Sequence, residues 1–240
     1  MNNINKINTI DNWKDNEYIL NKYHLEQYKT EYESVKFIKK YIKNLVIKNI
    51  LDLGCGAGSL CYHLNDNNIY YNGIDINNEC IDIAKNNNNS NNSFFINKSF
   101  TELQTNIQYD LVLSNQTLLI IEPLLQNNFI EKHFELSNNY VIFFSLFTDS
   151  LLNYETKIID PYFNQVVFYN INSIHKIEEI GKKYKFKLIN NDKFEIKKKL
   201  EKNREGRQTY TIETNNSKLL QFSDVYYMPW KILLFKKYEN

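Results

Sequence analysis

Three glycines and two aspartates in the first third of the chain have the types and spacing of a nucleoside-binding site. The stretch ILDLGCGAGSL, residues 50–60, contains three of the six glycines in the sequence, Gly54, Gly56 and Gly58. Asp52 lies two residues before the first glycine, and Asp75 ends a second apolar run in NGIDIN. A glycine-rich turn between a strand and a helix presents backbone N–H groups and a positive helix end to a ligand. A carboxylate at the end of the next strand can accept hydrogen bonds from both hydroxyls of a ribose. We therefore expect an adenosine-containing ligand.

The glycine spacing differs from that of the dinucleotide-binding fingerprint. That fingerprint reads G-x-G-x-x-G, whereas the third glycine here comes one position earlier and is followed by Ser59. The pattern is therefore a poor match to an NAD site. A tight turn without a ligand remains the alternative, and Asp75 alone could serve as a carboxylate at a helix N-terminus.

Short apolar runs alternate with helical patterns through the next hundred residues, which predicts parallel strands joined by crossover helices. The expected strands are 46–53, 69–76, 93–97, 109–115 and 140–147, and the expected helices are 59–64, 78–85 and 123–136. Before them, apolar residues recur at three- and four-residue steps from Tyr28 to Leu45, as on one face of an amphipathic helix.

The second half of the chain has a different rhythm. We expect a loop that carries Asp149 and the Asp160-Pro161 pair, followed by a helix near 172–183 and a strand near 185–196. Two hairpin strands then surround an NNS turn, and residues 229–237 form the last strand. At 240 residues the chain fits one domain. Its parts are an N-terminal helical cap (11–45), a cofactor half (46–147) and a substrate-side half (148–240) with a hairpin insertion near 204–225.

The glycine turn, Asp75 and the run YDLVLSNQTLLII resemble the class I S-adenosylmethionine-dependent methyltransferases over about residues 46–147. The resemblance implies a doubly wound, Rossmann-like α/β fold, with a mostly parallel seven-stranded sheet and an antiparallel last strand. It implies S-adenosylmethionine as cofactor and S-adenosylhomocysteine as product. The turn would face the methionine part of the cofactor. The other implied cofactor-binding residues are Asp75 at the ribose, Ile76 next to it in sequence, Ser99 and Phe100 at the adenine, Asn115 beside the reactive methyl group, and Asp52 two residues before the first glycine.

The chain departs from the family at two places. Many small-molecule members have Glu-His four and five residues after the position of Asn115, where this chain has Leu119 and Ile120. Asn115 is also not followed by the Pro-Pro-aromatic sequence of enzymes that methylate exocyclic amines of bases. Base N-methylation is therefore disfavoured, and a cofactor-binding subunit without catalysis is an alternative.

Candidates for the acceptor side lie near the two ends of the chain. In the resembled family the N-terminal helical segment closes over cofactor and substrate, so Tyr23, His24 and Tyr28 are candidate contacts, unless they are core aromatics. His24 and Asp149 are candidate general bases for a hydroxyl acceptor. A phosphate-type oxygen would need no base. The only two arginines could then bind it through bidentate hydrogen bonds, or else pair with nearby glutamates: Arg204 and Arg207.

Composition favours a small acceptor in the cytoplasm. The formal net charge is +1 and charged residues are spread along the chain, so the electrostatic footprint of bulk nucleic-acid binding is missing. Three cysteines without a CxxC pair suit a reducing compartment, and neither a metal-ligand set nor an apolar run of the roughly 20 residues needed to span a membrane is present. The sequence leaves the oligomeric state open.

The C-terminal strands look like those of bacterial methyltransferases in capsule and O-antigen biosynthesis. This resemblance implies O-methylation of a small anionic acceptor, either a nucleotide-linked sugar or a phosphate or phosphoramidate group. The alternative enzyme is a tRNA or rRNA methyltransferase, which would carry a basic stripe near its pocket.

Overall fold

The computed structural model describes residues 28–104, 106–160, 165–202 and 209–238. Five parallel strands form the cofactor half: β1 (Asn49–Leu53), β2 (Tyr70–Asp75), β3 (Ser93–Asn97), β4 (Tyr109–Asn115) and β5 (Ser137–Thr148). β12 (Trp230–Lys237) lies antiparallel between β5 and β8 (Phe186–Lys193), which gives the order β3-β2-β1-β4-β5-β12-β8. The predicted doubly wound sheet with an antiparallel last strand is confirmed.

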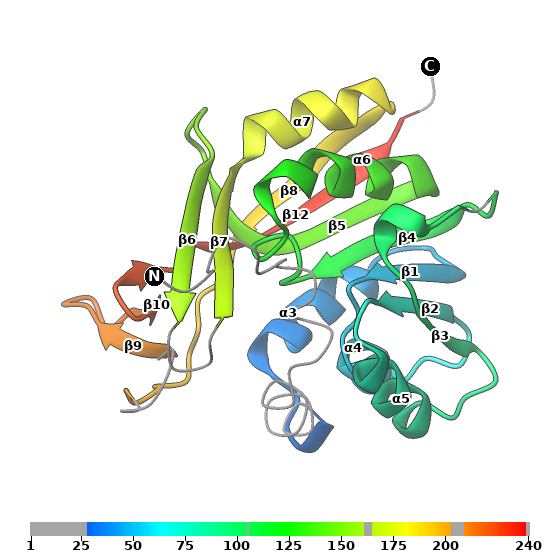
Figure 1. The fold of residues 1–240 in the computed structure, drawn as a ribbon, viewed down its shortest axis with the longest axis horizontal. Helices are drawn as coiled ribbons and strands as arrows, with labels where there is room; N and C mark the ends of the chain where they lie inside the picture. Colours follow the sequence, from blue (N-terminus) through cyan, green and yellow to red (C-terminus); the bar gives the residue numbers. More distant parts are fainter. Residues whose placement is uncertain (1–27, 105, 161–164, 203–208, 239–240) are drawn as a thin grey trace, which may run out of the picture.

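Helices cover both faces of this sheet (Figure 1). α3 (Glu33–Ile42), α4 (Ser59–Leu64) and α5 (Asn78–Asn87) lie on one face, and α6 (Gln126–Leu136) and α7 (Ile174–Lys183) lie on the other. Side chains of β1 alternate between the two layers, because Ile50 packs with α3 to α5 whereas Leu51 and Leu53 pack with α6 and α7. Each such fully buried side chain contributes about 1.5–3 kcal/mol. Asp52 is therefore on the same face of β1 as Ile50.

Two connections contain a one-turn helix. η3 (Phe100–Glu102) lies between β3 and β4, and η4 (Pro123–Leu125) precedes α6. The N-terminal helix also begins later than its apolar pattern predicts: residues 28 and 29 are helical, residues 30–32 interrupt the helix, and α3 starts at Glu33. No helix in the described part of the chain is long and apolar enough to cross a membrane.

The loop expected after β5 is confirmed at Asp149, because residues 149–153 form neither helix nor strand, but it is wrong at Asp160, which ends a strand. β6 (Tyr154–Asp160) and β7 (Gln165–Ser173) form an antiparallel hairpin, and the end of β7 pairs in parallel with the end of β5. Much of β6 is exposed, with Tyr154 at 47% and Ile159 at 57%, so burial imposes no clear alternation on its sequence. Pairing with β7 along the whole strand defines it instead.

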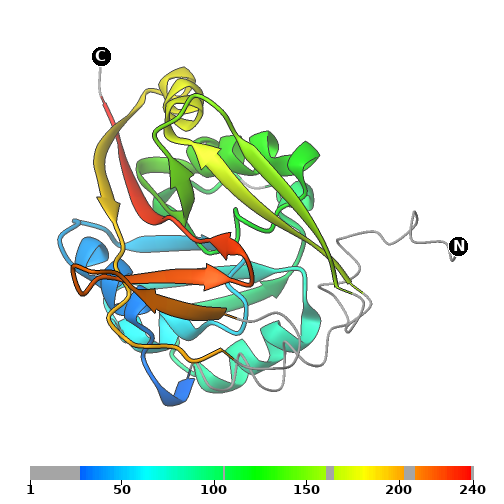
Figure 2. The same cartoon turned by 90° about the vertical axis from the view of Figure 1, so that its left-hand side faces the viewer.

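The predicted C-terminal hairpin is present. β9 (Thr209–Glu213), β10 (Leu219–Ser223) and the short β11 (Tyr226–Tyr227) form a separate antiparallel sheet. Figure 2 shows it at the end of the molecule that faces the viewer. It contacts β7 through Tyr169, whose hydroxyl lies 3.0 Å from Ser223 Oγ and whose ring lies against that of Tyr226. The hairpin β6–β7 and the sheet of β9, β10 and β11 therefore lie together at one end of the central sheet.

Candidate cofactor site

The glycine turn between β1 and α4 has a backbone that other residues adopt only with strain. Gly54, Gly56 and Gly58 have φ angles of +82°, +52° and +78°. A Cβ on Gly54 would lie 2.4 Å from Cγ2 of Thr117, and one on Gly58 would meet Ala84 at 3.0 Å. Glycine is thus needed at the first position both for conformation and for close approach. Within the turn, the N–H groups of Gly54 and Cys55 donate to the Ile74 carbonyl and that of Gly58 donates to the Cys55 carbonyl. Presentation of turn N–H groups to a ligand therefore stays a prediction.

Asp75 ends β2 and faces this turn. Its Oδ2 accepts a hydrogen bond from the Gly56 N–H at 2.8 Å, and its Oδ1 accepts one from the Asn77 N–H at 2.9 Å. Burial raises the pKa of Asp75, although the hydrogen bonds from Asn77, Gly56 and Ile76 act in the opposite direction. A carboxylate has about four lone-pair sites. The two oxygens are therefore fixed in place and can still accept hydroxyls of a ribose.

Neighbouring side chains hold Asp75 in position. Asn97, the last residue of β3, donates to the carbonyls of Asp75 at 3.1 Å and Ile76 at 2.8 Å. Asn77 caps α5 by accepting from the Cys80 N–H at 2.9 Å. The sequence reasoning missed both asparagines. For Asn97 the available signal was its place as a polar residue at the carboxyl end of the third strand.

Ser99 and Phe100 follow β3 along the same edge. Ser99 Oγ accepts from the Thr101 N–H at 3.3 Å and caps η3, while the Phe100 ring meets Phe129 edge-on at 5.0 Å. Both residues lie in the segment that follows the strand next to Asp75. Their contacts with an adenine stay a prediction.

Asp52 lies beneath the turn and is only 1% exposed. The Tyr71 hydroxyl donates to its Oδ2, and Oδ1 has no partner among the described residues. Burial raises the pKa of Asp52 to about 7, with the charge of Asp75 adding to the effect and the Tyr71 hydrogen bond opposing it. The recorded hydrogen bond of Asp52 therefore joins β1 to Tyr71 of β2, and contact of Asp52 with the cofactor stays a prediction.

The segment after β4 forms the other wall of the site. Gln116 has a φ of +63°, and its N–H donates to the Phe144 carbonyl at 2.8 Å. Such backbone strain in a non-glycine residue concentrates at functional sites. The Thr117 hydroxyl donates to the Gly54 carbonyl at 3.1 Å. The buried Oδ1 of Asn115 has no hydrogen-bond partner among the described residues, and its contact with the cofactor stays a prediction.

Apolar residues follow where many family members carry Glu-His. Leu119 is 4% exposed and belongs to the core cluster under α3 to α5, and Ile120 packs against that cluster. These side chains therefore supply packing at that position.

The acceptor-side candidates are only partly described. Tyr23, His24, Arg204 and Arg207 lie outside the described residues. The Tyr28 hydroxyl accepts from Asn88 Nδ2 at 3.3 Å, its ring lies 5.0 Å from that of Tyr62, and burial raises its pKa. Tyr28 thus packs against α4 and α5 rather than extending into solvent, and its contact with substrate stays a prediction.

Asp149, just after β5, forms an ion pair. Both of its carboxylate oxygens accept from Lys231 Nζ, at 2.9 Å and 2.8 Å. These hydrogen bonds hold the pKa of Asp149 below its usual range. A carboxylate in this state is a weak proton acceptor, so the geometry gives little support to the predicted base. Its catalytic role stays a prediction.

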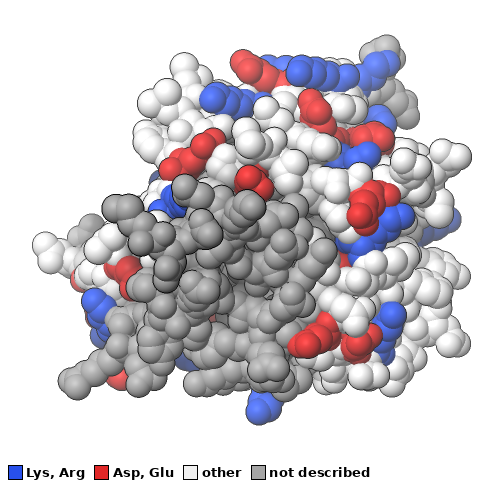
Figure 3. Space-filling view, in the orientation of Figure 1, with Lys and Arg blue, Asp and Glu red and all other residues white. Residues whose placement is uncertain are grey.

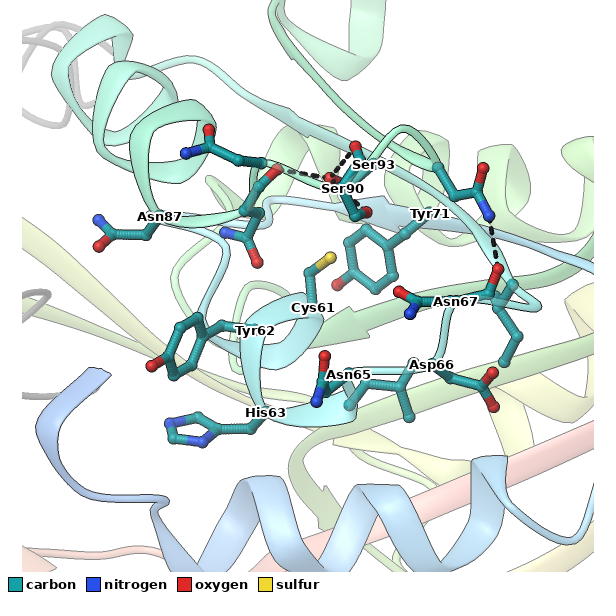
Figure 4. Close-up of a pocket in the computed structure, with 15 residues that line it drawn as sticks. Cys61, Tyr62, His63, Asn65, Asp66, Asn67, Tyr71, Asn87, Ser90 and Ser93 are labelled. Carbon is teal, nitrogen blue, oxygen red and sulfur yellow. Dashed lines mark hydrogen bonds between the residues drawn. The ribbon is translucent and has the colours of Figure 1, made fainter.

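A cavity of about 510 Å³ lies on the opposite edge of the sheet (Figure 4), at the amino ends of β2 and β3. The side chains of Cys61, Asn65, Asn67 and Tyr71 point toward its middle. The glycine turn and Asp75 are not among its lining residues. This cavity is therefore separate from the site at the carboxyl edge.

Comparison with known proteins agrees with this geometry. Residues 46–143 match a family model described as a methyltransferase domain, and no curated protein sequence matches the chain. The magnesium protoporphyrin IX methyltransferase of Synechocystis PCC 6803, solved with bound S-adenosylmethionine, is similar in fold. Its TM-score is 0.60 at 14% identity, with 97% of this chain and 98% of that chain covered.

Two further structures show the same fold with different stated acceptors. The 1,6-didemethyltoxoflavin methyltransferase of Burkholderia thailandensis matches with a TM-score of 0.55 at 12% identity, covering 92% of this chain and 88% of that chain. A candidate RNA methyltransferase from Pyrococcus horikoshii matches with a TM-score of 0.53 at 16% identity, covering 98% and 95%. The left-handed glycine turn and the fixed Asp75 carboxylate lie where the resemblance to this family predicts the cofactor site. Residues 46–143 therefore match a methyltransferase domain, and this match supports methyl transfer from S-adenosylmethionine as the activity of the chain.

Proposed function

We propose that the chain methylates an oxygen atom of a small acceptor that is already anionic at neutral pH. One observation carries this proposal: the described residues that end β4 and β5 provide no strong base. Residues 114–117 offer hydroxyls and amides, and the single carboxylate in residues 147–149, that of Asp149, is paired with Lys231. An anionic oxygen needs no deprotonation before it attacks.

The chain's own residues then act by positioning. When bound, S-adenosylmethionine supplies an electrophilic methyl group on a sulfonium, which is displaced in line. Asp75 and the glycine turn would orient the cofactor, and Asn115 with the strained Gln116 would form the wall beside the transfer path. Holding both reactants aligned in a site that excludes water can supply a large part of the rate enhancement.

Surface charge supports a small acceptor over a nucleic acid. On the face shown in Figure 3, acidic and basic side chains of the described residues are interspersed rather than gathered into a stripe. The formal net charge of the whole chain is +1. Binding of a long polyanion depends on clustered Lys and Arg.

For the acceptor itself we propose a phosphate-type oxygen, either that of a nucleotide-linked sugar or that of a phosphate or phosphoramidate group, in surface-polysaccharide biosynthesis. The resemblance of the C-terminal strands to methyltransferases of such pathways supports this class, as does the pair Arg204 and Arg207, suited to binding an anion. The similar structures include enzymes named for a porphyrin and for a toxoflavin precursor, both small molecules.

Transfer of label from methyl-labelled S-adenosylmethionine tests the proposal. One pool would contain nucleotide-activated sugars and phosphorylated small molecules, and the other total tRNA and rRNA. We expect label in the first pool, with a rate nearly constant from about pH 6.5 to 9 because no group must lose a proton. A rate that climbs tenfold per pH unit would instead indicate a hydroxyl acceptor.

An RNA acceptor is the second candidate, favoured by the likeness to the Pyrococcus horikoshii protein over 98% of this chain. Label confined to the RNA pool would replace the first proposal with this one.

A further inference from the structure

A buried asparagine side chain attaches the hairpin β6–β7 to the segment after β4. Asn170 in β7 is 1% exposed. Its Nδ2 donates to the carbonyls of Leu119 at 2.9 Å and Ile121 at 2.7 Å, and its backbone N–H donates to Leu119 at 2.8 Å. Three hydrogen bonds thus join one residue of the hairpin to two neighbouring carbonyls of that segment.

The same segment contacts the cofactor turn at its other end. Thr117 donates its hydroxyl to the Gly54 carbonyl, and its side chain occupies the space that a Cβ on Gly54 would need. The Ile120 N–H donates to the Thr117 carbonyl at 3.0 Å and closes a turn between the two contacts. A short and internally hydrogen-bonded stretch, residues 117–121, therefore connects β7 with the glycine turn.

We propose that Asn170 is a positioning residue for the cofactor site: it fixes residues 117–121 so that Thr117 holds the glycine turn in its binding conformation. Asn170 touches no cofactor in this arrangement and acts through Thr117. The hairpin on the acceptor side is thereby coupled to cofactor binding. This inference does not depend on which acceptor the enzyme uses.

Asn172 provides a matched control. It lies two residues further along β7, so its side chain points to the same face, and it is 2% exposed. Its Nδ2 has no hydrogen-bond partner within the described part of the chain. Replacing either asparagine by alanine removes the same buried volume, but only Asn170→Ala removes the two side-chain hydrogen bonds to residues 117–121.

Calorimetric titration with S-adenosylmethionine tests the proposal. We expect Asn170→Ala to raise the Kd about tenfold, equivalent to about 1.4 kcal/mol. Asn172→Ala should leave the Kd within about twofold, although both variants lower the melting temperature.

Thr117→Val should also weaken binding. The double variant Asn170→Ala/Thr117→Val should bind no more weakly than the weaker single variant, because both act through one segment. Equal Kd values for Asn170→Ala and Asn172→Ala, or additive losses in the double variant, would overturn the proposal.

Hydrogen exchange on the wild-type protein gives a second test that needs no variant to fold. S-adenosylmethionine should slow exchange in peptides covering residues 116–122 and 165–173 together with the glycine turn. Slowing confined to the turn and β2 would show that β7 is not coupled, and would contradict the proposal even if the chain is an active methyltransferase on any acceptor.

Discussion

At the scale of single residues, the site depends on carboxylates that the backbone holds in place. Asp75 is bound by the N–H groups of Gly56 and Asn77, so its oxygens have one orientation before any ligand arrives. A carboxylate that is already oriented loses little conformational entropy when it accepts hydrogen bonds from a ligand. The position of Asp75 thus explains why one carboxylate can contribute strongly to cofactor affinity.

Asp75→Ala should weaken S-adenosylmethionine binding at least tenfold, a loss of about 1.4 kcal/mol or more. Asp110→Ala is the matched control, because Asp110 likewise accepts from two backbone N–H groups, those of Lys48 and Asn49, but at the amino edge of the sheet. Calorimetry on both variants gives the comparison. Wild-type affinity in Asp75→Ala would refute the assigned ribose contact.

Asp52 should make stability fall as pH rises. Its pKa is raised to about 7 by burial, against an ordinary value of 3.8, so between about pH 4 and 7 the folded protein keeps a proton that the unfolded chain releases. From pH 5 to 7.5 the wild type should therefore lose on the order of 2 kcal/mol more than Asp52→Asn. Urea unfolding at several pH values measures the difference. Parallel curves for the two proteins would contradict the burial argument.

Sequence patterns identified residues that can be recognised by their residue type and spacing. They missed residues whose side chains donate hydrogen bonds to backbone carbonyls. Gly54, Asp52 and Asp75 follow strands with a recognisable rhythm. Thr117 and Asn170 bond to carbonyl oxygens of residues distant in sequence, at separations of 63 and 51 positions. Any residue has a carbonyl, so no residue type marks such a contact before the chain is folded.

At the scale of elements, the glycine turn and the segment after β4 form one packed unit. Gly54→Ala would place a methyl group 2.4 Å from Thr117 and force a residue with a side chain into a φ of +82°. We expect a loss of about 1–3 kcal/mol in the free energy of unfolding. Cofactor affinity should fall as well, because the displaced Thr117 can no longer hold the turn. Thermal melts and calorimetry check both effects, and a fully stable Gly54→Ala would argue against the close contact.

The ion pair between the end of β5 and the start of β12 is a second element-scale contact. The Lys231 side chain is 6% exposed, so Asp149→Asn leaves a buried ammonium without its partner and should cost about 1–3 kcal/mol. Adding Lys231→Met should recover most of this loss, since a similar apolar side chain replaces the charge. Melting temperatures and methyl transfer would be measured together. Methyl transfer reduced a hundredfold in Asp149→Asn, at unchanged stability, would instead support the predicted general base.

Elements with a buried face were predictable, and those defined by a partner strand were not. The sequence segments that form β1, β2, β4 and β5 are largely apolar because helices cover both faces of the sheet. β6 has no such pattern, since its residues are largely exposed and it exists by pairing with β7. The apolar spacing from Tyr28 onward likewise predicted one continuous helix and gave no sign of the interruption of that helix at residues 30–32.

At the scale of the whole molecule, the two edges of the sheet carry different features. The carboxyl edge holds the glycine turn, Asp75 and the segment after β4, whereas the amino edge holds the polar cavity (Figure 4). Tyr71 links the two, because its ring lines the cavity and its hydroxyl donates to Asp52 beneath the turn. Asn88 also lines the cavity and donates to the Gly58 carbonyl at 3.5 Å, so substitutions around the cavity can affect the cofactor site through Asp52 or through the turn itself.

Charge distributed over the whole molecule predicts weak and only mildly salt-sensitive binding of tRNA. Each phosphate contact adds about 0.7–0.9 to the slope of log affinity against log salt, and such contacts need clustered cations. With a net charge of +1 and both signs interspersed on the face in Figure 3, few contacts can form at once. We expect a slope of about 2 or less in magnitude and a Kd weaker than about 10 μM at 150 mM salt, measured with the cofactor bound. A small acceptor meets no such requirement, because one or two cations suffice to hold it. A slope of about 5 or more with submicromolar affinity would mean that residues 1–27 or 203–208 complete a basic surface, and the acceptor would then be RNA.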